Sequence, residues 1–526
     1  MKRIRDPIYG YIEIEDEFIP LIDSPEFQRL RDISQTGYAA LFPCALHNRF
    51  VHSLGVFFLG KMAFANFKRN VAPRYPSLSE EGWARYGRTF SLACLLHDVG
   101  HSPFSHTGER FYEANTGLIE QISDLARSPS LRQDMDEKGK GYGNPHEAMS
   151  VIVGLGLLGR LGKDIDHDRE FFARSIMGIS YEKDAELGDD VDSVFLNAII
   201  GMLNGHLVDV DKIDYLRRDA YVTGYSSMAI DYERLLGGFT VSSCGHERVP
   251  AFKKQALSVI ENIIQANDLE RRWVQSSPVI LYDGRLIEMA MVRFNDFMMK
   301  GKERKPEYPN IFNATALSKN GFPPEDKIPL RLLSDNDILG YLKNYEEGQI
   351  YDQYFSRGER LKPLWKNEAE FEWFVRDRIS HSNLTDLYDT LRKACSPPAL
   401  LFFLDEEEHR KHEGDEDATK ILDIFRGFAH RYQLDYRFAI IKGTAFKSNY
   451  DKIVSAPLYV ELEEGKAILL KDTLKVQAVD NDRGKFLFHV YTTSSNMDRA
   501  GGRERLRSEL AEWLNRSWMT IGGLTQ

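Results

Sequence analysis

Apolar residues recur at helical spacing through most of the first 300 residues, and this periodicity constrains the fold more than any other feature of the chain. The clearest segments are 52–69, 88–100, 146–158, 190–205 and 210–224. Each returns an apolar side chain every three or four residues, which is typical of a helix that packs on one face. Ser24 before Pro25 marks one helix start, and Gly100 marks one helix end. A mainly helical first part is therefore predicted.

The pattern changes further along the chain. The polar, glycine-rich stretch 131–145 is typical of a loop, and the charged, Pro-rich and Gly-rich stretch 301–330 of a boundary or a long insertion. From about residue 436, β-rich stretches precede a last helical segment. A chain of 526 residues exceeds the usual size of one hydrophobic core. We expect a mainly α fold, with a helical domain over residues 1–330 and a C-terminal α+β accessory region over residues 331–526.

Composition excludes several classes of protein. The net charge of −11 argues against a broadly basic nucleic-acid coat, unless basic residues cluster locally. The four cysteines are scattered without CxxC spacing, which predicts neither a disulfide framework nor a cysteine zinc site. The amino-terminal MKRIRDPIYG has no apolar signal region, and no stretch approaches about 18 uninterrupted apolar residues. We expect a cytoplasmic protein with no membrane partner.

Histidines gather in one part of the chain. Six of the 14 lie between His47 and His146, and LLHDVGHSPFSH (95–106) holds three of them beside Asp98. His97 and His101 have the spacing of a zinc-protease HExxH motif, but Asp98 replaces the glutamate and Gly100 ends the helix. Structural histidines at a helix end are the other simple interpretation of this stretch.

A different metal site fits this stretch better. The adjacent His97 and Asp98 offer a nitrogen and an oxygen to a divalent cation. Further ligands must come from elsewhere in the chain. The upstream histidines are His47 and His52, and the downstream carboxylates are Asp209, Asp211, Asp214 and Asp219. Residue types alone leave the choice among them open.

Six motifs then identify a family. In chain order, the sequence carries DPIYGYIEI, DSPEFQRLRDISQTG, FPCALHNRFVHSLGV, LLHDVGHSPFSHTGE, NPHEAMS and VDKIDYLRRDAYVTG. They resemble the motifs of the HD-domain deoxynucleoside triphosphate (dNTP) triphosphohydrolases, most closely the vertebrate SAM-and-HD-domain type and its bacterial homologues. The resemblance is dense over residues 1–290 and thinner to about 370. We expect no SAM domain, because DPIYG begins at residue 6.

The resemblance implies a catalytic centre. One divalent metal ion would be held by His52, His97, Asp98 and Asp211, and this donor set does not choose among Mg, Mn, Fe, Zn and Ni. The reaction would convert a dNTP into a deoxynucleoside and inorganic triphosphate. His101 matches the catalytic histidine that gives a proton to the leaving oxygen, assisted by His146 and Glu109. Glu109 stands where the vertebrate type has aspartate, so its carboxylate reaches one methylene further.

The resemblance also implies substrate contacts. Those to the triphosphate would come from Arg49, His106, Lys212 and Tyr215. Gln35 and Asp219 match residues that bind the 3′-hydroxyl, and Tyr282 matches an aromatic residue that packs against the sugar. Thr36 departs from the family, which has leucine there. Threonine is smaller and can hydrogen-bond, so strict selection of deoxyribose is in doubt.

A regulatory site is a further expectation. Asp23, Gln28 and Arg31 match positions that bind an activating guanine nucleotide in the vertebrate type, and Arg5 replaces an asparagine of that site. An ordinary helix start with surface side chains explains the same residues equally well. In relatives these nucleotides lie between subunits, so the expectation includes a homo-oligomer, a dimer or a tetramer.

Two alternatives to a dNTP triphosphohydrolase stay open. One is another HD phosphohydrolase, which acts on ribonucleotides, nucleoside monophosphates or dinucleoside polyphosphates. The other is a catalytically silent scaffold that senses nucleotides or binds single-stranded nucleic acid. Neither the sequence nor the resemblance separates control of nucleotide pools from defence against phage, or assigns a role to residues 380–526.

Overall fold

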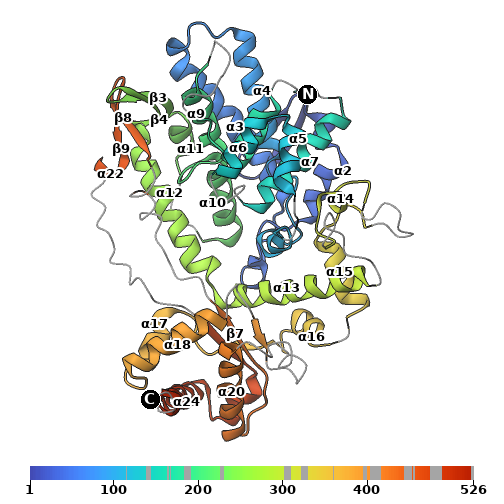
Figure 1. Ribbon diagram of the computed structural model, residues 1–526, viewed down its shortest axis with the longest axis vertical. Helices are drawn as coiled ribbons and strands as arrows, with labels where there is room; N and C mark the ends of the chain where they lie inside the picture. The colour runs from blue at the N-terminus through green and yellow to red at the C-terminus, as the bar shows by residue number, and fades with distance from the viewer. Residues whose placement is uncertain are drawn as a thin grey trace. The chain divides into compact units, whose positions relative to one another are not determined.

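A computed structural model describes residues 1–113, 115, 117–137, 144–162, 165, 168–182, 191–225, 230–300, 310–321, 330–346, 348–358, 360–394, 400–402, 416–442, 453, 457–473 and 488–522. The chain forms two compact units that alternate along the sequence (Figure 1). The first unit comprises Met1–Glu270, Met291–Tyr341 and Ser448–Ala478, and the second comprises Arg271–Ala290, Leu342–Lys447 and Val479–Gln526. The expected division at residue 330 stays a prediction.

The first unit is mainly helical. Its helices are α1 Ile19–Ile22, α2 Pro25–Gln28, α3 Arg49–Val71, α4 Glu80–Leu96, α5 Leu118–Ala126, α6 Pro129–Glu137, α7 Pro145–Arg160, α8 Arg169–Met177, α9 Ser193–Leu203, α10 Val210–Thr223, α11 Tyr232–Leu236, α12 Leu257–Glu270, α14 Ala314–Leu317 and α22 Leu470–Thr473. Helices α13 (Pro278–Met299) and α15 (Asp335–Asn344) contribute residues to both units.

Two small sheets complete the first unit. Strands β1 (Lys2–Asp6) and β2 (Gly10–Ile14) form an antiparallel hairpin. A second sheet has the order β3-β4-β8-β9, built from Phe239–Cys244, Glu247–Lys253, Tyr459–Glu463 and Lys466–Leu469. Strand β8 pairs in parallel with β4, so a segment from late in the chain completes a sheet of the first unit.

Side-chain caps explain where the central helices begin. Asn48 accepts a hydrogen bond from the Val51 amide at the start of α3, and Ser79 accepts one from the Gly82 amide at the start of α4. Asp209 accepts one from the Lys212 amide at the start of α10. Helix α3 packs against both α4 and α10 and so forms the centre of the unit.

Helix α6 differs from the sequence-based expectation of a loop over 131–145. Leu131 and Met135, four residues apart, are fully buried, and the Ser128 hydroxyl caps the helix by accepting from the Leu131 amide. The apolar stripe of two residues was too short to outweigh the surrounding polar composition. Residues 138–143 of that stretch lie outside the described part of the chain.

Helix α3 together with the turn after it, Arg49–Arg74, is long and apolar enough to cross a membrane by length and composition. However, 67% of its most apolar window is buried inside the molecule. Such burial is typical of a core helix in a globular unit.

The second unit combines a sheet with helices. The sheet order is β5-β10-β7-β6, from Lys362–Pro363, Phe488–Thr492, Phe438–Lys442 and Leu400–Phe402, and every pairing is antiparallel. The helices are α16 Gln349–Phe355, α17 Glu368–Val375, α18 His381–Ala394, α20 Glu416–Arg431, α23 Ser494–Arg499 and α24 Arg503–Gly522.

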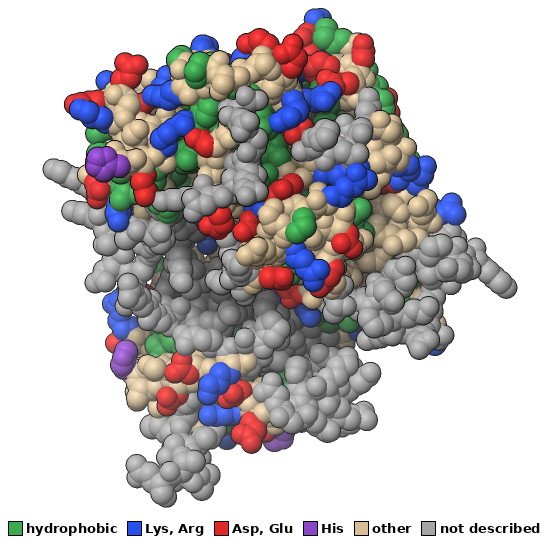
Figure 2. Space-filling model, turned by 45° about the horizontal axis from the view of Figure 1, so that its top comes forward, with side chains coloured by type: hydrophobic (Ala, Val, Ile, Leu, Met, Phe, Trp, Pro, Cys, Tyr) green, Lys and Arg blue, Asp and Glu red, His purple; other side chains and the backbone are tan. Residues whose placement is uncertain are grey.

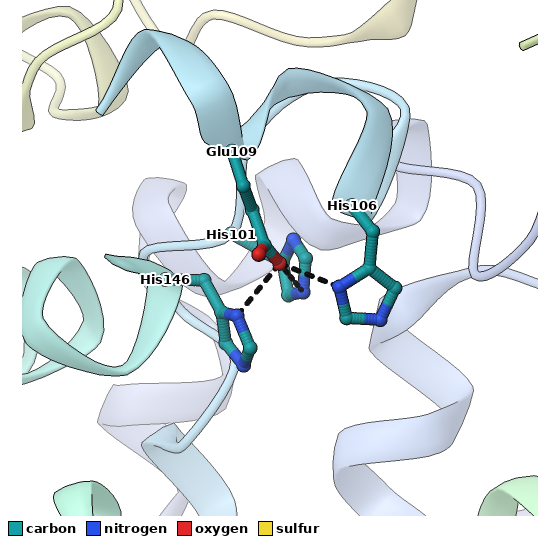
Figure 3. Close-up of side chains that lie close together, drawn as sticks. All are labelled: His101, His106, Glu109 and His146. Atoms are coloured by element: carbon teal, nitrogen blue, oxygen red, sulfur yellow. Dashed lines mark hydrogen bonds and ion pairs between the residues drawn. The ribbon is translucent and has the colours of Figure 1, made fainter. Parts of the chain in front are cut away.

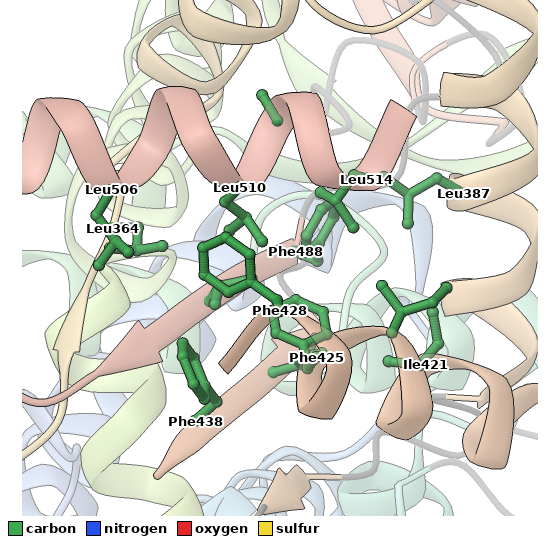
Figure 4. Close-up of a cluster of buried hydrophobic side chains, with 14 of the residues drawn as sticks. Leu364, Leu387, Ile421, Phe425, Phe428, Phe438, Phe488, Leu506, Leu510 and Leu514 are labelled. Atoms are coloured by element: carbon green, nitrogen blue, oxygen red, sulfur yellow. The ribbon is translucent and has the colours of Figure 1, made fainter. Parts of the chain in front are cut away.

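One face of α24 supplies much of the core of the second unit. Leu506, Leu510 and Leu514 recur every fourth residue and point towards Phe428 of α20 and Phe488 of β10 (Figure 4). The mainly α fold with a C-terminal α+β region, which was predicted from the sequence, is confirmed.

Candidate functional site

The four predicted metal ligands come together in the first unit. His52 Nε2 lies 3.3 Å from His97 Nε2 and 2.9 Å from an oxygen of Asp211. Asp98 places one oxygen 3.6 Å from His52 Nε2 and the other 3.5 Å from His97 Nε2. One donor atom each of His52, His97 and Asp98 lies within 4.8 Å of the other two. These separations allow one small cation to contact all of them.

Helix ends position these ligands. His52 lies in the first turns of α3, and Asp211 is the second residue of α10. His97 is the C-cap residue directly after the last residue of α4, and Asp98 belongs to the turn that follows. The packing of α3 against α4 and α10 then brings ligands together from positions far apart in the sequence.

The hydrogen bonds of the two imidazoles direct their lone pairs towards each other. His97 Nδ1 lies 2.9 Å from the Cys94 carbonyl oxygen, and His52 Nδ1 lies 2.7 Å from Asp214 Oδ2. Because both partners accept, each Nδ1 carries the hydrogen, and each Nε2 is left as a potential ligand atom. Without a proton or a metal ion between them, two such lone pairs at 3.3 Å would repel each other.

The electrostatics of the cluster also favour a cation. Burial would lower the pKa of His52, but its hydrogen bonds to Asp211 and Asp214 outweigh burial and raise the pKa to about 9. Burial would raise the pKa of Asp98, whereas Arg49 and His97 hold it well below its usual range. Two imidazoles and two carboxylates suit a first-row divalent metal or Mg²⁺. The residues therefore fit a divalent metal ion.

A chain of buried charges supports His52 from behind. The carboxylate of Asp214 accepts two hydrogen bonds from Arg218, at 3.0 and 2.9 Å, in addition to that of His52. Arg218 in turn donates to Asp6 Oδ2 at 2.9 Å. Sequence reasoning assigned no role to Asp6 or Arg218 and named Asp214 only among several carboxylates. The spacing of Asp214 and Arg218, four residues apart on a packed helix, was the available signal.

Gly55 allows α10 to approach α3 closely. A Cβ atom at this position would lie 1.9 Å from Asp214 Oδ1 and 2.6 Å from Arg218 Nη2. Any larger residue would therefore displace the carboxylate that holds His52.

A second polar cluster surrounds Glu109 (Figure 3). One oxygen of Glu109 lies 2.7 Å from His146 Nδ1, 2.6 Å from His106 Nδ1 and 3.7 Å from His101 Nε2. The rings of His101 and His146 stack at 4.3 Å. The three residues predicted to act in catalysis, His101, Glu109 and His146, are thus brought together, with His106 at the exposed edge.

The positive charge of this cluster belongs to His146 rather than to His101. Burial would lower the pKa of His146, but Glu109 outweighs burial and raises it to about 9. Burial, followed by Arg49 and His146, lowers the pKa of His101 well below its usual value. In the free protein Glu109 therefore does not keep His101 protonated, because burial and the surrounding positive groups outweigh this carboxylate.

Two consecutive residues in a left-handed backbone conformation shape this loop. Phe104 and Ser105 have φ values of 53° and 54°. The Phe104 amide donates to Asp335 Oδ1 at 2.6 Å, and the Ser105 hydroxyl donates to the Ser34 carbonyl. These contacts offset the backbone strain and direct the next turn, Ser105–Phe111, so that it presents His106 and Glu109.

The predicted phosphate contacts surround the same region. Arg49 donates to Asp98 Oδ2 at 2.7 Å and to the Ser105 hydroxyl at 2.9 Å, so it bridges the ligand cluster and the left-handed loop. Lys212 bonds to Asp209 and the Gly205 carbonyl, and Tyr215 accepts from Asn267 at 2.7 Å. Their roles towards phosphate stay predictions.

The predicted contacts to the 3′-hydroxyl, Gln35 and Asp219, and the neighbouring Thr36 place polar atoms in the interior of the first unit. Gln35 Oε1 and Thr36 Oγ1 are buried and have no hydrogen-bond partner among the described residues. Asp219 lies 2.7 Å from His47 Nε2. Burial raises the pKa of Asp219 to about 7, and Glu270 is a further hydrogen-bonding neighbour. His47 and Glu270 are thus neighbours of Asp219, although the sequence singled out only His47, as one possible metal ligand.

The remaining predicted residues lie elsewhere. Tyr282 belongs to the second unit, where its ring stacks on Tyr491 at 4.9 Å and its hydroxyl bonds to Gln353. Its sugar contact stays a prediction. The four residues of the expected regulatory site all lie on the β1–β2 hairpin or on the segment from α1 to the turn after α2. They are Arg5, Asp23, Gln28 and Arg31.

All four of those residues have partners within the unit. The Arg5 guanidinium lies over the Tyr11 ring, 4.9 Å from its centroid. Asp23 pairs with Lys2 at 2.6 Å. Gln28 donates to the Ile22 carbonyl at 2.7 Å and accepts from Arg31 at 2.8 Å. A nucleotide at this position stays a prediction.

Known proteins resemble this chain in part of its sequence or in its fold. The chain is 32% identical over 238 residues to a deoxynucleoside triphosphate triphosphohydrolase SAMHD1 homolog from Dictyostelium discoideum, which covers 45% of the chain and 39% of that protein. It is 34% identical over 253 residues to deoxynucleoside triphosphate triphosphohydrolase SAMHD1 of Mus musculus, which covers 45% of the chain and 34% of that protein. An uncharacterised protein from Methanocaldococcus jannaschii is 28% identical over 295 residues, which is 56% of the chain and 50% of that protein.

The matches thus span half or less of these relatives' own lengths. No protein-family model matches the chain. The crystal structure of a hypothetical protein from Aquifex aeolicus has the same fold, with a TM-score of 0.55 and 21% identity over 97% of this chain and 99% of that chain. Over about half of its length, the chain is thus similar in sequence to proteins named as dNTP triphosphohydrolases.

Proposed function

We propose that the protein is a metal-dependent hydrolase that converts dNTPs into a deoxynucleoside and inorganic triphosphate. The observation that carries the proposal is the convergence of His52 Nε2 and His97 Nε2 with Asp98 and Asp211, in a chain related to enzymes named for this reaction. His52, His97, Asp98 and Asp211 would hold the metal. When bound, a divalent metal lowers the pKa of water and withdraws charge from phosphate.

Arg49 would link substrate binding to the ligand cluster. Its guanidinium already donates to Asp98, and its remaining donors suit a phosphate oxygen. His146, whose pKa is raised to about 9 by Glu109, is an imidazolium at neutral pH and offers a positively charged donor beside the cluster. These groups would orient the triphosphate and compensate its charge.

His101 would protonate the leaving 5′ oxygen when the P–O bond breaks and water bonds to phosphorus. In the free protein its pKa is lowered by burial and by Arg49, so the imidazole is neutral near pH 7. A triphosphate beside it would raise this pKa, since negative charge favours the imidazolium. Substrate binding would thus protonate His101 and prepare it to act as the proton donor.

The second candidate substrate is a ribonucleoside triphosphate. The observation that favours it is the buried Thr36 hydroxyl, which has no partner among the described residues. A hydroxyl at this position can hydrogen-bond a ribose 2′-hydroxyl, which a leucine would exclude. The same active site would then serve both sugar types.

A silent nucleic-acid-binding scaffold is less well supported. The ligand cluster and the Glu109 cluster are both complete, and the net charge is −11. On the face drawn in Figure 2, acidic and basic side chains are interspersed over the coloured residues. Homo-oligomer formation and activation by a nucleotide stay predictions.

The deciding experiment is analysis of products. Purified protein is incubated with each dNTP and each NTP in the presence of Mg²⁺ or Mn²⁺, with an unmetallated sample as control. Deoxynucleoside and inorganic triphosphate are expected. Release of pyrophosphate or orthophosphate, or no turnover with any nucleotide, would contradict the proposal.

A further inference from the structure

A continuous line of charged groups joins the amino-terminal hairpin to a predicted metal ligand. It runs from Asp6 at the end of β1, through Arg218 and Asp214 of α10, to His52 of α3. The successive separations are 2.9 Å, 2.9–3.0 Å and 2.7 Å. All four side chains are at most 4% exposed. Such a buried line is costly in free energy unless every charge is paired, and here each one is.

We propose that Asp6 is a positioning residue for metal binding, which acts through Arg218 and Asp214 on the orientation of His52. The proposal rests on the metal site of the proposed function. Outer groups of this kind set the tautomer and direction of a ligand histidine. Here the carboxylate that contacts the histidine is Asp214. Two further residues, Arg218 and Asp6, continue the line into a hairpin that carries none of the predicted ligands.

The two oxygens of Asp6 have separate tasks. Oδ1 accepts hydrogen bonds from the Ile8 amide at 2.8 Å and the Tyr9 amide at 3.0 Å, and so holds the turn between β1 and β2. Among the described residues, Oδ2 accepts a hydrogen bond from Arg218 alone. A change that keeps Oδ1 and alters Oδ2 therefore separates the local turn from the link to the metal site.

The charge of Arg218 explains how the effect would travel. Its guanidinium lies between two carboxylates, Asp6 and Asp214. Without the negative charge of Asp6, the positive charge of Arg218 would be neutralised by Asp214 alone, and the ion pair between these two residues would strengthen. Asp214 would then be a weaker acceptor for His52 Nδ1, and the ring would hold its direction towards the metal less firmly.

The variant Asp6→Asn tests this link, because asparagine keeps the Oδ1 acceptor and removes the charge. We would measure the dissociation constant of Mn²⁺ from the intact protein by electron paramagnetic resonance of free Mn²⁺. A 10- to 100-fold weaker affinity is expected, the usual effect of losing an outer partner.

Glu13→Gln is the matched control. Glu13 lies on the same hairpin and also pairs with an arginine, Arg3, at 2.6 Å, but that pair is exposed and leads to no ligand. Its Mn²⁺ affinity should stay within about twofold of the unmodified chain, since an exposed pair of this kind contributes little. Equal Mn²⁺ affinity in Asp6→Asn and Glu13→Gln would overturn the proposal.

Arg218→Lys gives an independent test, should Asp6→Asn not fold. A lysine keeps the positive charge but cannot bind two carboxylates with a planar fork. The same loss of Mn²⁺ affinity is expected. Where Asp6→Asn does fold, the Asp6→Asn/Arg218→Lys double variant should bind Mn²⁺ no more weakly than the weaker of the two single variants. Additive losses, or unchanged affinity in Arg218→Lys, would contradict the link. If the unmodified protein binds no Mn²⁺, the metal proposal itself fails, and this result is distinct from equal binding by the variants.

Discussion

Replacement of Gly55 by alanine tests how tightly the ligand helices are packed. In an ordinary helix interior this change stabilises a protein by about 1 kcal/mol, because glycine is a poor helix former. At position 55 the new methyl group would lie 1.9 Å from Asp214 Oδ1 and 2.6 Å from Arg218 Nη2. Neither atom can simply swing away, since both are held in the buried charge line.

The magnitude follows from the two ways of relieving this overlap. Moving the helices apart is overpacking, which costs about 1–3 kcal/mol. Displacing Asp214 leaves buried charges without a partner, which costs about 3–5 kcal/mol. After the gain of about 1 kcal/mol from helix propensity is subtracted, we expect a net destabilisation of roughly 0–2 kcal/mol if the helices move apart and roughly 2–4 kcal/mol if Asp214 is displaced, together with weaker metal binding.

Gly156→Ala provides the matched control. Gly156 also lies inside a helix of the first unit, α7, and a Cβ there would meet nothing within 4 Å. This variant should gain about 0.5–1 kcal/mol. Denaturant midpoints measured by circular dichroism in the presence of a chelator compare the two. If Gly55→Ala shifts the midpoint upwards as Gly156→Ala does, the reasoning about the close approach of α3 and α10 is wrong.

Three further predictions concern the site. Asp211→Ala should abolish turnover and stoichiometric metal binding, and a variant that keeps both would show that the ligand set is wrong. The charge of His146 is present below pH 9 and lost above it. Binding of a non-hydrolysable dNTP analogue should therefore weaken as the pH rises through about 9. In Glu109→Gln, the pH at which binding weakens should fall by at least about 2 units, because Glu109 is the main group that raises the pKa of His146. If that pH does not change, Glu109 does not control the charge of His146. Thr36→Leu should lower the ratio of NTP to dNTP turnover by about tenfold or more, and an unchanged ratio would exclude a role for this hydroxyl.

The local fold was predictable where a pattern was long. Helices α3, α4, α7, α9 and α10 follow apolar periodicity with recognisable caps, and they were expected from the sequence. Helix α6 was missed because only Leu131 and Met135 mark its buried face. Apolar periodicity predicts a helix only when the apolar positions recur over several turns.

The candidate site divides in the same way. Family motifs predicted residues that the structure brings together, such as His52 with Asp211 and Glu109 with His146. The contact of Asp6 with Arg218, 212 residues later, depends on tertiary packing and has no local signal. The low pKa of His101 depends on burial and on neighbours from other segments, which a sequence does not display.

The β3-β4-β8-β9 sheet has a consequence for the synthesis of the chain and for its truncated forms. Strand β8 covers the free edge of β4, and Glu461 of β8 also bonds to Arg74 and to Ser242. A ribosome must therefore release about 460 residues before the first unit can close this edge. A chain that ended near residue 330 would expose the amide and carbonyl groups of β4 to other strands, which favours aggregation of truncated or prematurely ended products.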